Sequence, residues 1–143
     1  MKPFVYNCIV DRVIDGDTVD VHIDLGFNTW LMKRRIRLKG VDTPEIRTRD
    51  ELEKKFGFLA KSIVEGFCPP GEKILVETEI DNDDKFGRIL GTLWVDNGSL
   101  NLNQYLIENH YGVAYEGQSK DLIEQAHLEN FRYLAENGKI QLD

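Results

Sequence analysis

Cysteine and long hydrophobic runs are scarce in this sequence. Its 143 residues include only two cysteines, Cys8 and Cys68, which do not form the Cys-x-x-Cys pair of many zinc and redox sites. No segment approaches the about 20 apolar residues that cross a bilayer, and residues 1–7 lack the apolar stretch of about 7–15 residues that marks a secretory signal. We therefore expect buried, reduced thiols in a cytoplasmic protein that does not bind a membrane.

Positive charge is also in deficit. The chain has 18 Lys and Arg against 25 Asp and Glu, a net charge of −7. This balance excludes a broad basic surface of the kind that dominates nucleic-acid affinity in many proteins. Basic residues nevertheless gather between positions 33 and 49, at Lys33, Arg34, Arg35, Arg37, Lys39, Arg47 and Arg49. This cluster is either a local contact surface for nucleic acid or simply a solvated strand and loop.

The composition is that of a folded, soluble domain. Hydrophobic residues make up 41% of the chain and charged residues 30%, close to the average for globular proteins. A chain of this length can bury one sizeable core. No internal repeat, low-complexity segment or linker divides it, so we expect one domain over residues 1–143.

Hydrophobic periodicity predicts the order of the elements. Strict alternation of apolar and polar residues from 19 to 25 is typical of a half-buried strand, and a helical period begins after a plausible N-cap at Asp50. The predicted strands cover residues 4–14, 19–25, 30–38, 74–80 and 89–95, and the predicted helices cover 50–66, 100–109 and 120–136. The order favours an α+β fold, a five-stranded OB-type barrel with three helices.

Four carboxylates occupy strand ends or turns, where a rigid scaffold presents functional groups. They are Asp15, Asp17, Asp42 and Glu45. Hard divalent cations bind carboxylate, carbonyl and water oxygens, so Asp17 and Asp42, if two turns bring them together, suit Ca²⁺ or Mg²⁺. An Asp-Gly-Asp sequence by itself more often only forms a turn.

Two arginines and a glutamate complete a candidate site. Arg37 ends a predicted strand five residues before Asp42, and Arg88 precedes another predicted strand. Planar guanidinium groups match phosphate oxygens and can neutralise charge that develops on them, although each arginine alone more often forms a surface ion pair. Glu45 could orient an attacking water or accept its proton, and Pro44 would stiffen the turn that carries it. The pattern points to phosphodiester hydrolysis.

Three blocks together resemble the thermonuclease (staphylococcal nuclease-like) family. They are Ile-Asp-Gly-Asp-Thr-Val at 14–19, Arg-Leu-Lys-Gly-Val-Asp-Thr-Pro-Glu at 37–45 and Lys-Phe-Gly-Arg at 85–88. Each block is weak evidence alone, but their order and spacing agree with the family over residues 8–135. The resemblance implies an OB-fold barrel with added helices and a Ca²⁺-dependent endonuclease that hydrolyses DNA and RNA, with Mg²⁺ or Mn²⁺ as alternative metals.

The resemblance also implies residue roles at the metal. Asp17, Asp42 and the backbone carbonyl of Thr43 correspond to the metal ligands, and Glu45 corresponds to the residue that serves the attacking water.

Further roles concern the substrate. Arg37 and Arg88 correspond to the residues that hold the scissile phosphate, and Lys85 to a contact with the neighbouring phosphate. Tyr115 resembles the aromatic residue over which the nucleotide lies.

Three functional hypotheses follow. The first is a metal-dependent nuclease acting on DNA, RNA or both, most simply as a monomer. The second is a non-catalytic OB-type module that binds nucleic acid or protein, because fold alone does not establish activity. The third, a structural or assembly protein, has only the acidic surface in its favour. His22, His110 and His127 lie outside all three blocks, and we expect structural or surface roles for them.

Overall fold

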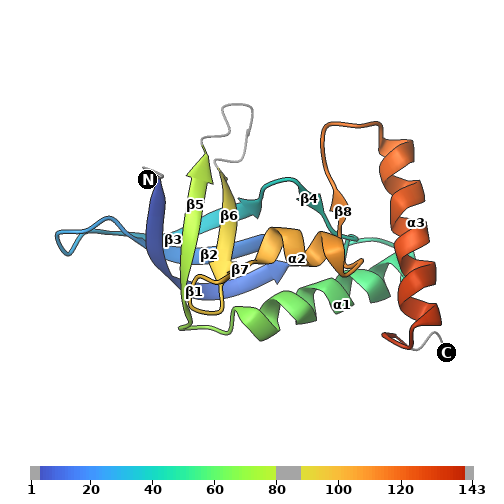
Figure 1. The fold of residues 1–143 in the computed structure, drawn as a ribbon, viewed down its shortest axis with the longest axis horizontal. Coiled ribbons are helices and arrows are strands. Elements are labelled where there is room, and N and C mark those ends of the chain that lie inside the picture. Colours follow the sequence, from blue (N-terminus) through green and yellow to red (C-terminus); the bar gives the residue numbers. More distant parts are fainter. Residues whose placement is uncertain (1–3, 80–87, 141–143) are drawn as a thin grey trace.

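Five strands close into a barrel in the computed structural model, which describes residues 4–79 and 88–140. The strands are β1 (Val5–Asp15), β2 (Thr18–Asp24), β3 (Trp30–Leu38), β5 (Lys73–Glu79) and β6 (Ile89–Val95). Neighbouring strands pair antiparallel in the order β3-β2-β1-β5-β6, and a parallel pairing of β3 with β6 closes the ring. Figure 1 shows this barrel with the helices beside it. The predicted α+β OB-type fold is confirmed.

The alternation seen in β2 explains how the barrel interior is filled. Val19, Val21 and Ile23 are at most 2% exposed, and the register places Val10 of β1 opposite Val21. Successive side chains of a strand point to opposite faces, so the intervening polar residues, among them Asp20, lie on the outer face. Fully burying one such aliphatic side chain is worth about 1.5–3 kcal/mol, and the core therefore holds these strands in register.

Helix α1 (Glu51–Phe67) covers one end of the barrel. The predicted N-cap is confirmed, because the Asp50 side chain accepts hydrogen bonds from the backbone N–H groups of Leu52 and Glu53. Phe56, Ala60 and Val64 are buried, at the i, i+4 spacing that places side chains on one helical face.

The other two helices, α2 and α3, follow the barrel strands in the sequence. Helix α2 (Leu102–Glu108) is shorter than predicted, because Leu100 and Asn101 form strand β7 against the end of β6 and the Asn101 side chain caps the helix. Helix α3 (Lys120–Glu136) has the predicted bounds. Within residues 4–79 and 88–140, no helix is long and apolar enough to cross a membrane.

Helix α3 packs against α1 through a second, smaller cluster of apolar residues. Phe131 and Leu134 of α3 are buried there with Phe56 of α1. The rings of Phe56 and Phe131 stack with centroids 4.1 Å apart and an interplanar angle of 8°. This contact fixes α3 against the end of the molecule where α1 begins.

A two-stranded sheet was not expected from the sequence. Strand β4 (Val41–Asp42) pairs antiparallel with β8 (Val113–Ala114). Two residues are too few for a periodic signal, so only the chain's tertiary path reveals this pair. The pairing holds the segment that carries Asp42 beside the segment that leads into α3 (Figure 1).

Candidate active site

Gly16 allows the turn between β1 and β2 to lie directly against the turn that follows β4. A Cβ atom at this position would lie 2.8 Å from Oγ1 of Thr43 and 2.9 Å from Cβ of Ala60. Those distances are shorter than real side chains tolerate, so any larger residue would separate the two turns. The glycine thus brings Asp17 to Asp42 and Thr43.

Asp17 is buried, 9% exposed, and hydrogen-bonded in place. Its carboxylate accepts from the backbone N–H of Thr43 at 3.1 Å and from the hydroxyl of Thr18 at 3.1 Å. Burial opposes ionisation, but a hydrogen bond from Asp15, the charge of Arg37 and the Thr43 N–H together lower the pKa of Asp17. Burial and the neighbouring Asp17 raise the pKa of Asp15 to about 7. The pKa of Asp15 is thus raised and that of Asp17 lowered by their mutual contact.

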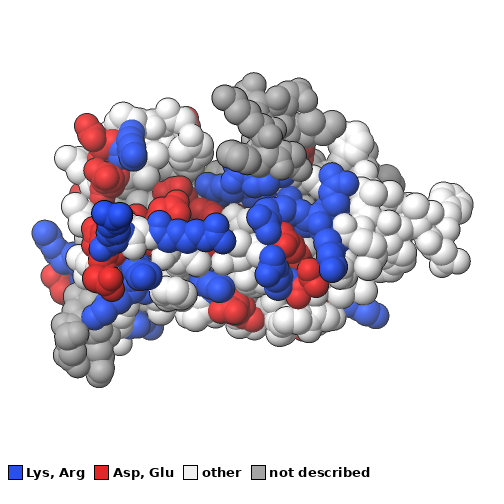
Figure 2. Space-filling model, turned by 180° about the vertical axis from the view of Figure 1, so that it is seen from behind, with Lys and Arg blue, Asp and Glu red and all other residues white. Residues whose placement is uncertain are grey.

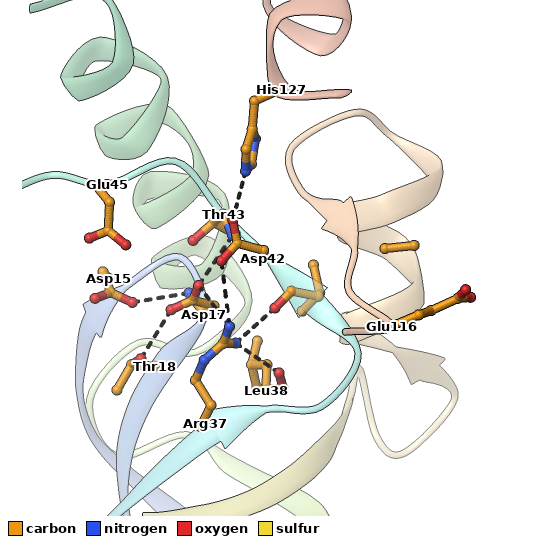
Figure 3. Close-up of polar contacts among 12 residues, drawn as sticks. Asp15, Asp17, Thr18, Arg37, Leu38, Asp42, Thr43, Glu45, Glu116 and His127 are labelled. Carbon is orange, nitrogen blue, oxygen red and sulfur yellow. Dashed lines mark hydrogen bonds and ion pairs between the residues drawn. The ribbon is translucent and has the colours of Figure 1, made fainter. Parts of the chain in front are cut away.

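Arg37 bridges the two candidate metal ligands. Its Nη1 donates to the carbonyls of Leu38 at 2.9 Å and Val41 at 2.8 Å, which anchors the guanidinium. Its Nη2 lies 3.5 Å from Oδ2 of Asp17 and 3.7 Å from Oδ1 of Asp42 (Figure 3). The side chain is 19% exposed, so its charge is fixed at the edge of the site.

Glu45 lies on the same side of the site as Asp15 (Figure 3). The residue is exposed, but partial burial of its carboxyl and then the negative charges of Asp17 and Asp42 raise its pKa. Its turn rests on Gly57 of α1, where a Cβ atom would lie 2.8 Å from the carbonyl oxygens of both Pro44 and Glu45. The helix surface therefore sets the position of the Glu45 backbone.

A cleft of about 290 Å³ joins these groups to Arg88. Its lining residues are Ile14, Asp15, Thr18, Arg35, Glu45, Ile46, Arg47 and Arg88. Arg88 reaches it from just before β6, a position made adjacent to β3 by the parallel pairing of Ile36 with Ile89. Barrel closure thus places Arg88 in one cleft with Glu45.

Two residues, Tyr115 and Lys85, are predicted to contact the nucleotide. Tyr115 directly follows β8, is 47% exposed, and donates its backbone N–H to the carbonyl of Gly40 at 2.8 Å. It therefore presents an accessible ring beside the connection between β3 and β4. Lys85 lies outside the described residues.

His127 is a contact of the site that sequence reasoning missed. Its Nε2 lies 2.8 Å from Oδ2 of Asp42, although the two residues are 85 positions apart (Figure 3). The ring is buried, 8% exposed. The only available signal was its place near the inner face of a predicted helix, which is equally typical of a core residue.

The donor set has the chemistry of a hard-cation site. Two carboxylates, Asp17 and Asp42, and the Thr43 carbonyl are oxygen donors of the kind that Ca²⁺ and Mg²⁺ take, with water filling the other positions. Asp15 and Glu45 lie close by, and the charges of Asp17 and Asp42 both act on Glu45, so the acidic groups gather at one position. Within residues 4–79 and 88–140, no group of three or more His, Cys, Asp or Glu side chains is arranged to hold a metal ion.

Comparisons with known proteins agree with this geometry. Endonuclease YhcR of Bacillus subtilis is 35% identical over 115 residues, which are 77% of this chain and 9% of that protein. An uncharacterized protein of Methanocaldococcus jannaschii is 30% identical over 125 residues, 74% of this chain and 58% of that protein. Thermonuclease of Staphylococcus intermedius is 30% identical over 94 residues, 66% of this chain and 52% of that protein. The chain therefore spans less than two thirds of each of these relatives.

A family model described as staphylococcal nuclease homologue matches residues 35–142, from β3 to the end of α3 and beyond. This range holds Arg37, Asp42, Glu45 and Arg88. The match covers more than half of the chain, and the chain belongs to the staphylococcal nuclease family of nucleases.

Proposed function

We propose that this chain is a metal-dependent endonuclease that hydrolyses phosphodiester bonds of DNA, RNA or both, with Ca²⁺ as its metal and Mg²⁺ or Mn²⁺ as alternatives. The observation that carries the proposal is the contact of one anchored guanidinium, Arg37, with Asp17 and Asp42, beside a cleft that Glu45 and Arg88 share. Two acids, an arginine pair and a further carboxylate are the groups that phosphodiester hydrolysis needs.

The metal ligands in this proposal are Asp17, Asp42 and the Thr43 carbonyl. When bound there, a divalent cation would polarise the phosphate and compensate its negative charge. The hydrogen bonds from Thr43 and Thr18 hold the Asp17 carboxylate in one orientation. The chain's own contribution at this position is a prearranged pair of carboxyl groups that Arg37 contacts.

Arg37 and Arg88 hold the scissile phosphate in our proposal. Arg37 is prevented from swinging away by its two carbonyl acceptors, so its charge is already in place when the phosphate arrives. Glu45 orients the attacking water and accepts its proton. Tyr115 provides an exposed ring for the nucleotide, and Lys85 a contact with the neighbouring phosphate.

The test is cleavage of labelled single- and double-stranded DNA and RNA in Ca²⁺, Mg²⁺, Mn²⁺ and excess chelator. We expect cleavage that chelator abolishes, and a loss of at least about 10²-fold in rate for Glu45→Ala and for Arg88→Ala, the scale of removing one preorganised group. Equal cleavage in chelator contradicts the metal dependence. Salt-sensitive binding without any product supports instead a non-catalytic OB-type module.

A further inference from the structure

The cleft beside the candidate site contains two arginines that the proposed mechanism does not use. Arg35 of β3 and Arg47, two residues after Glu45, both line it together with Arg88. Figure 2 shows the side of the molecule on which β2 and β3 lie, with Lys and Arg gathered across its middle and acidic side chains between them. In a chain of net charge −7, such a local concentration of guanidinium groups needs an explanation.

Arg35 is held by a buried carboxylate. Its Nε donates to Oδ1 of Asp20 at 2.9 Å and its Nη2 to Oδ2 at 3.2 Å, while Nε of Arg12 lies 3.6 Å from the same carboxylate. Asp20 is 7% exposed, and the Arg35 side chain is 45% exposed. One carboxylate therefore serves two guanidinium groups, so these three side chains together carry a net positive charge, and the Arg35 side chain is partly exposed.

The distance from Arg37 to Arg35 along β3 suits a substrate with phosphates at regular intervals. The pair Asp20–Arg35 follows the pair Thr18–Arg37 along the same β2–β3 ladder. Two residues of a strand span about 7 Å and return to the same face of the sheet. A nucleic-acid strand held at Arg37 and Arg88 would therefore have its next phosphate near Arg35.

We propose that Arg35 and Arg47 form a second phosphate-binding site in the cleft, which takes the phosphate of the adjoining nucleotide in a nucleic-acid strand. This inference rests on the proposed nuclease function and extends it to the substrate class, a strand of several nucleotides and not a single nucleotide. Asp15 and Glu45 are the acidic groups that also line the cleft, and the charge of Asp15 acts on Arg35. Holding Arg35 in one orientation lowers the cost of binding a phosphate.

The experiment measures binding of a single-stranded 12-mer in Ca²⁺ on a Glu45→Gln background, which slows cleavage. We expect Arg35→Gln and Arg47→Gln each to weaken binding about 10-fold and to reduce the salt dependence by about one phosphate contact. Arg34→Gln is the matched control, because it removes the same charge from the same strand at a residue that does not line the cleft. Arg47→Gln leaves the Asp20 ion pair intact and so keeps the test valid if Arg35→Gln unfolds.

A second measurement uses cleavage of a dinucleotide that has one phosphodiester. We expect kcat/KM on this substrate to change less than about twofold in Arg47→Gln. The second site is overturned if Arg47→Gln lowers kcat/KM on the dinucleotide by the same factor by which it weakens binding of the 12-mer. It is also overturned if Arg34→Gln weakens binding of the 12-mer as much as Arg35→Gln and Arg47→Gln do. If wild-type protein cleaves nothing, the proposed function fails, while the binding differences on the 12-mer still decide this inference.

A different observation concerns His127 and helix α3. Its Nε2 contacts Oδ2 of Asp42, whereas the other oxygen of Asp42, Oδ1, is the one that faces Arg37. Each oxygen of Asp42 thus has its own partner, which fixes the rotation of the carboxylate. Nδ1 of His127 is buried and has no partner among the described residues, so the ring donates through Nε2–H.

The geometry assigns His127 as a positioning residue for Asp42. It lies one helical turn before Phe131, whose ring stacks on Phe56 of α1, and Asn130 of the same helix donates to the carbonyl of Gly112. Several contacts therefore dock α3, and the bond from His127 to Asp42 is distinct from them. This inference too rests on the proposed function.

The readout is Ca²⁺ affinity, measured by calorimetry without substrate, beside thermal stability without metal. We expect His127→Phe to lower affinity about 10-fold, the scale for removing an outer hydrogen-bond partner of a ligand. His127→Gln should restore part of the affinity because it retains a donor. Phe131→Leu is the control, because it weakens α3 docking without removing the bond to Asp42.

An unchanged Ca²⁺ affinity in His127→Phe overturns the positioning role. So does an equal fall in affinity in Phe131→Leu, because the histidine would then act only by holding the helix. A wild-type chain that cleaves DNA with Ca²⁺ while His127→Phe binds Ca²⁺ normally refutes this inference and leaves the nuclease proposal intact.

Discussion

Replacing Gly57 by alanine should reduce activity by moving the turn that carries Glu45. The added methyl would lie 2.8 Å from the carbonyl oxygens of Pro44 and Glu45 and 2.9 Å from Cγ2 of Ile46. Ordinary contacts begin at 3.4 Å, so the turn must retreat by about 0.6 Å (3.4 − 2.8). A displacement approaching 1 Å at a catalytic group can cost about 10²-fold in rate. We expect kcat to fall between about 10-fold and 10²-fold.

The matched control is Gly66→Ala in the same helix. A Cβ atom at Gly66 meets nothing within 4 Å, and the residue is exposed. Alanine should raise the free energy of unfolding by about 0.5–1 kcal/mol there without changing kcat. The assay is initial rate on a DNA 12-mer, with urea unfolding of each variant. Full activity in folded Gly57→Ala protein would refute the idea that this contact positions Glu45.

Three further results are expected. Arg37→Lys should lower kcat by at least about 10²-fold in the cleavage assay, because an ammonium cannot serve two carbonyls and a phosphate together. Burial raises the pKa of both Cys8 and Cys68 from 9.0 to about 12. Their contribution to stability is therefore complete below pH 9 and is lost as pH rises toward 12. In urea unfolding, the free energy of unfolding should fall by up to about 1.4 kcal/mol per pH unit for each thiol, and by less in Cys8→Ala. Asn103→Ala should cost about 3 kcal/mol of unfolding free energy, because the Leu93 N–H and the Lys39 carbonyl each lose this partner and the Gly91 carbonyl keeps only the Lys39 N–H, whereas exposed Asn109→Ala should cost much less.

Local signals account for the elements that were predicted correctly. Alternation in residues 19–25 and the helical period after Asp50 depend on near neighbours in the sequence, and both elements formed within two residues of the expected bounds. Helix α2 also lies within two residues of the expected bounds, and its first two predicted residues form β7 because the pairing of Leu100 with Val95 overrides the helical pattern. The single-domain organisation over residues 1–143 and the monomeric state stay predictions.

For the candidate site too, the sequence identified residues and the structure gave their arrangement. Three sequence blocks identified Asp17, Arg37, Asp42, Glu45 and Arg88. The structure brings the first three into direct contact and places the other two in one cleft. Their functional roles stay proposals that the cleavage assays test.

The sequence by itself determined the five barrel strands and the positions of the three predicted helices, which family the motifs resemble, and which acids and arginines to examine. Only the tertiary structure decided that His127 holds Asp42 and that Asp20 holds Arg35. A periodic pattern states which face of an element is apolar but not which distant element covers it. The contact between His127 and Asp42 forms where α3 packs against the rest of the chain, among others through Phe131 on Phe56, and these residues are far apart in the sequence.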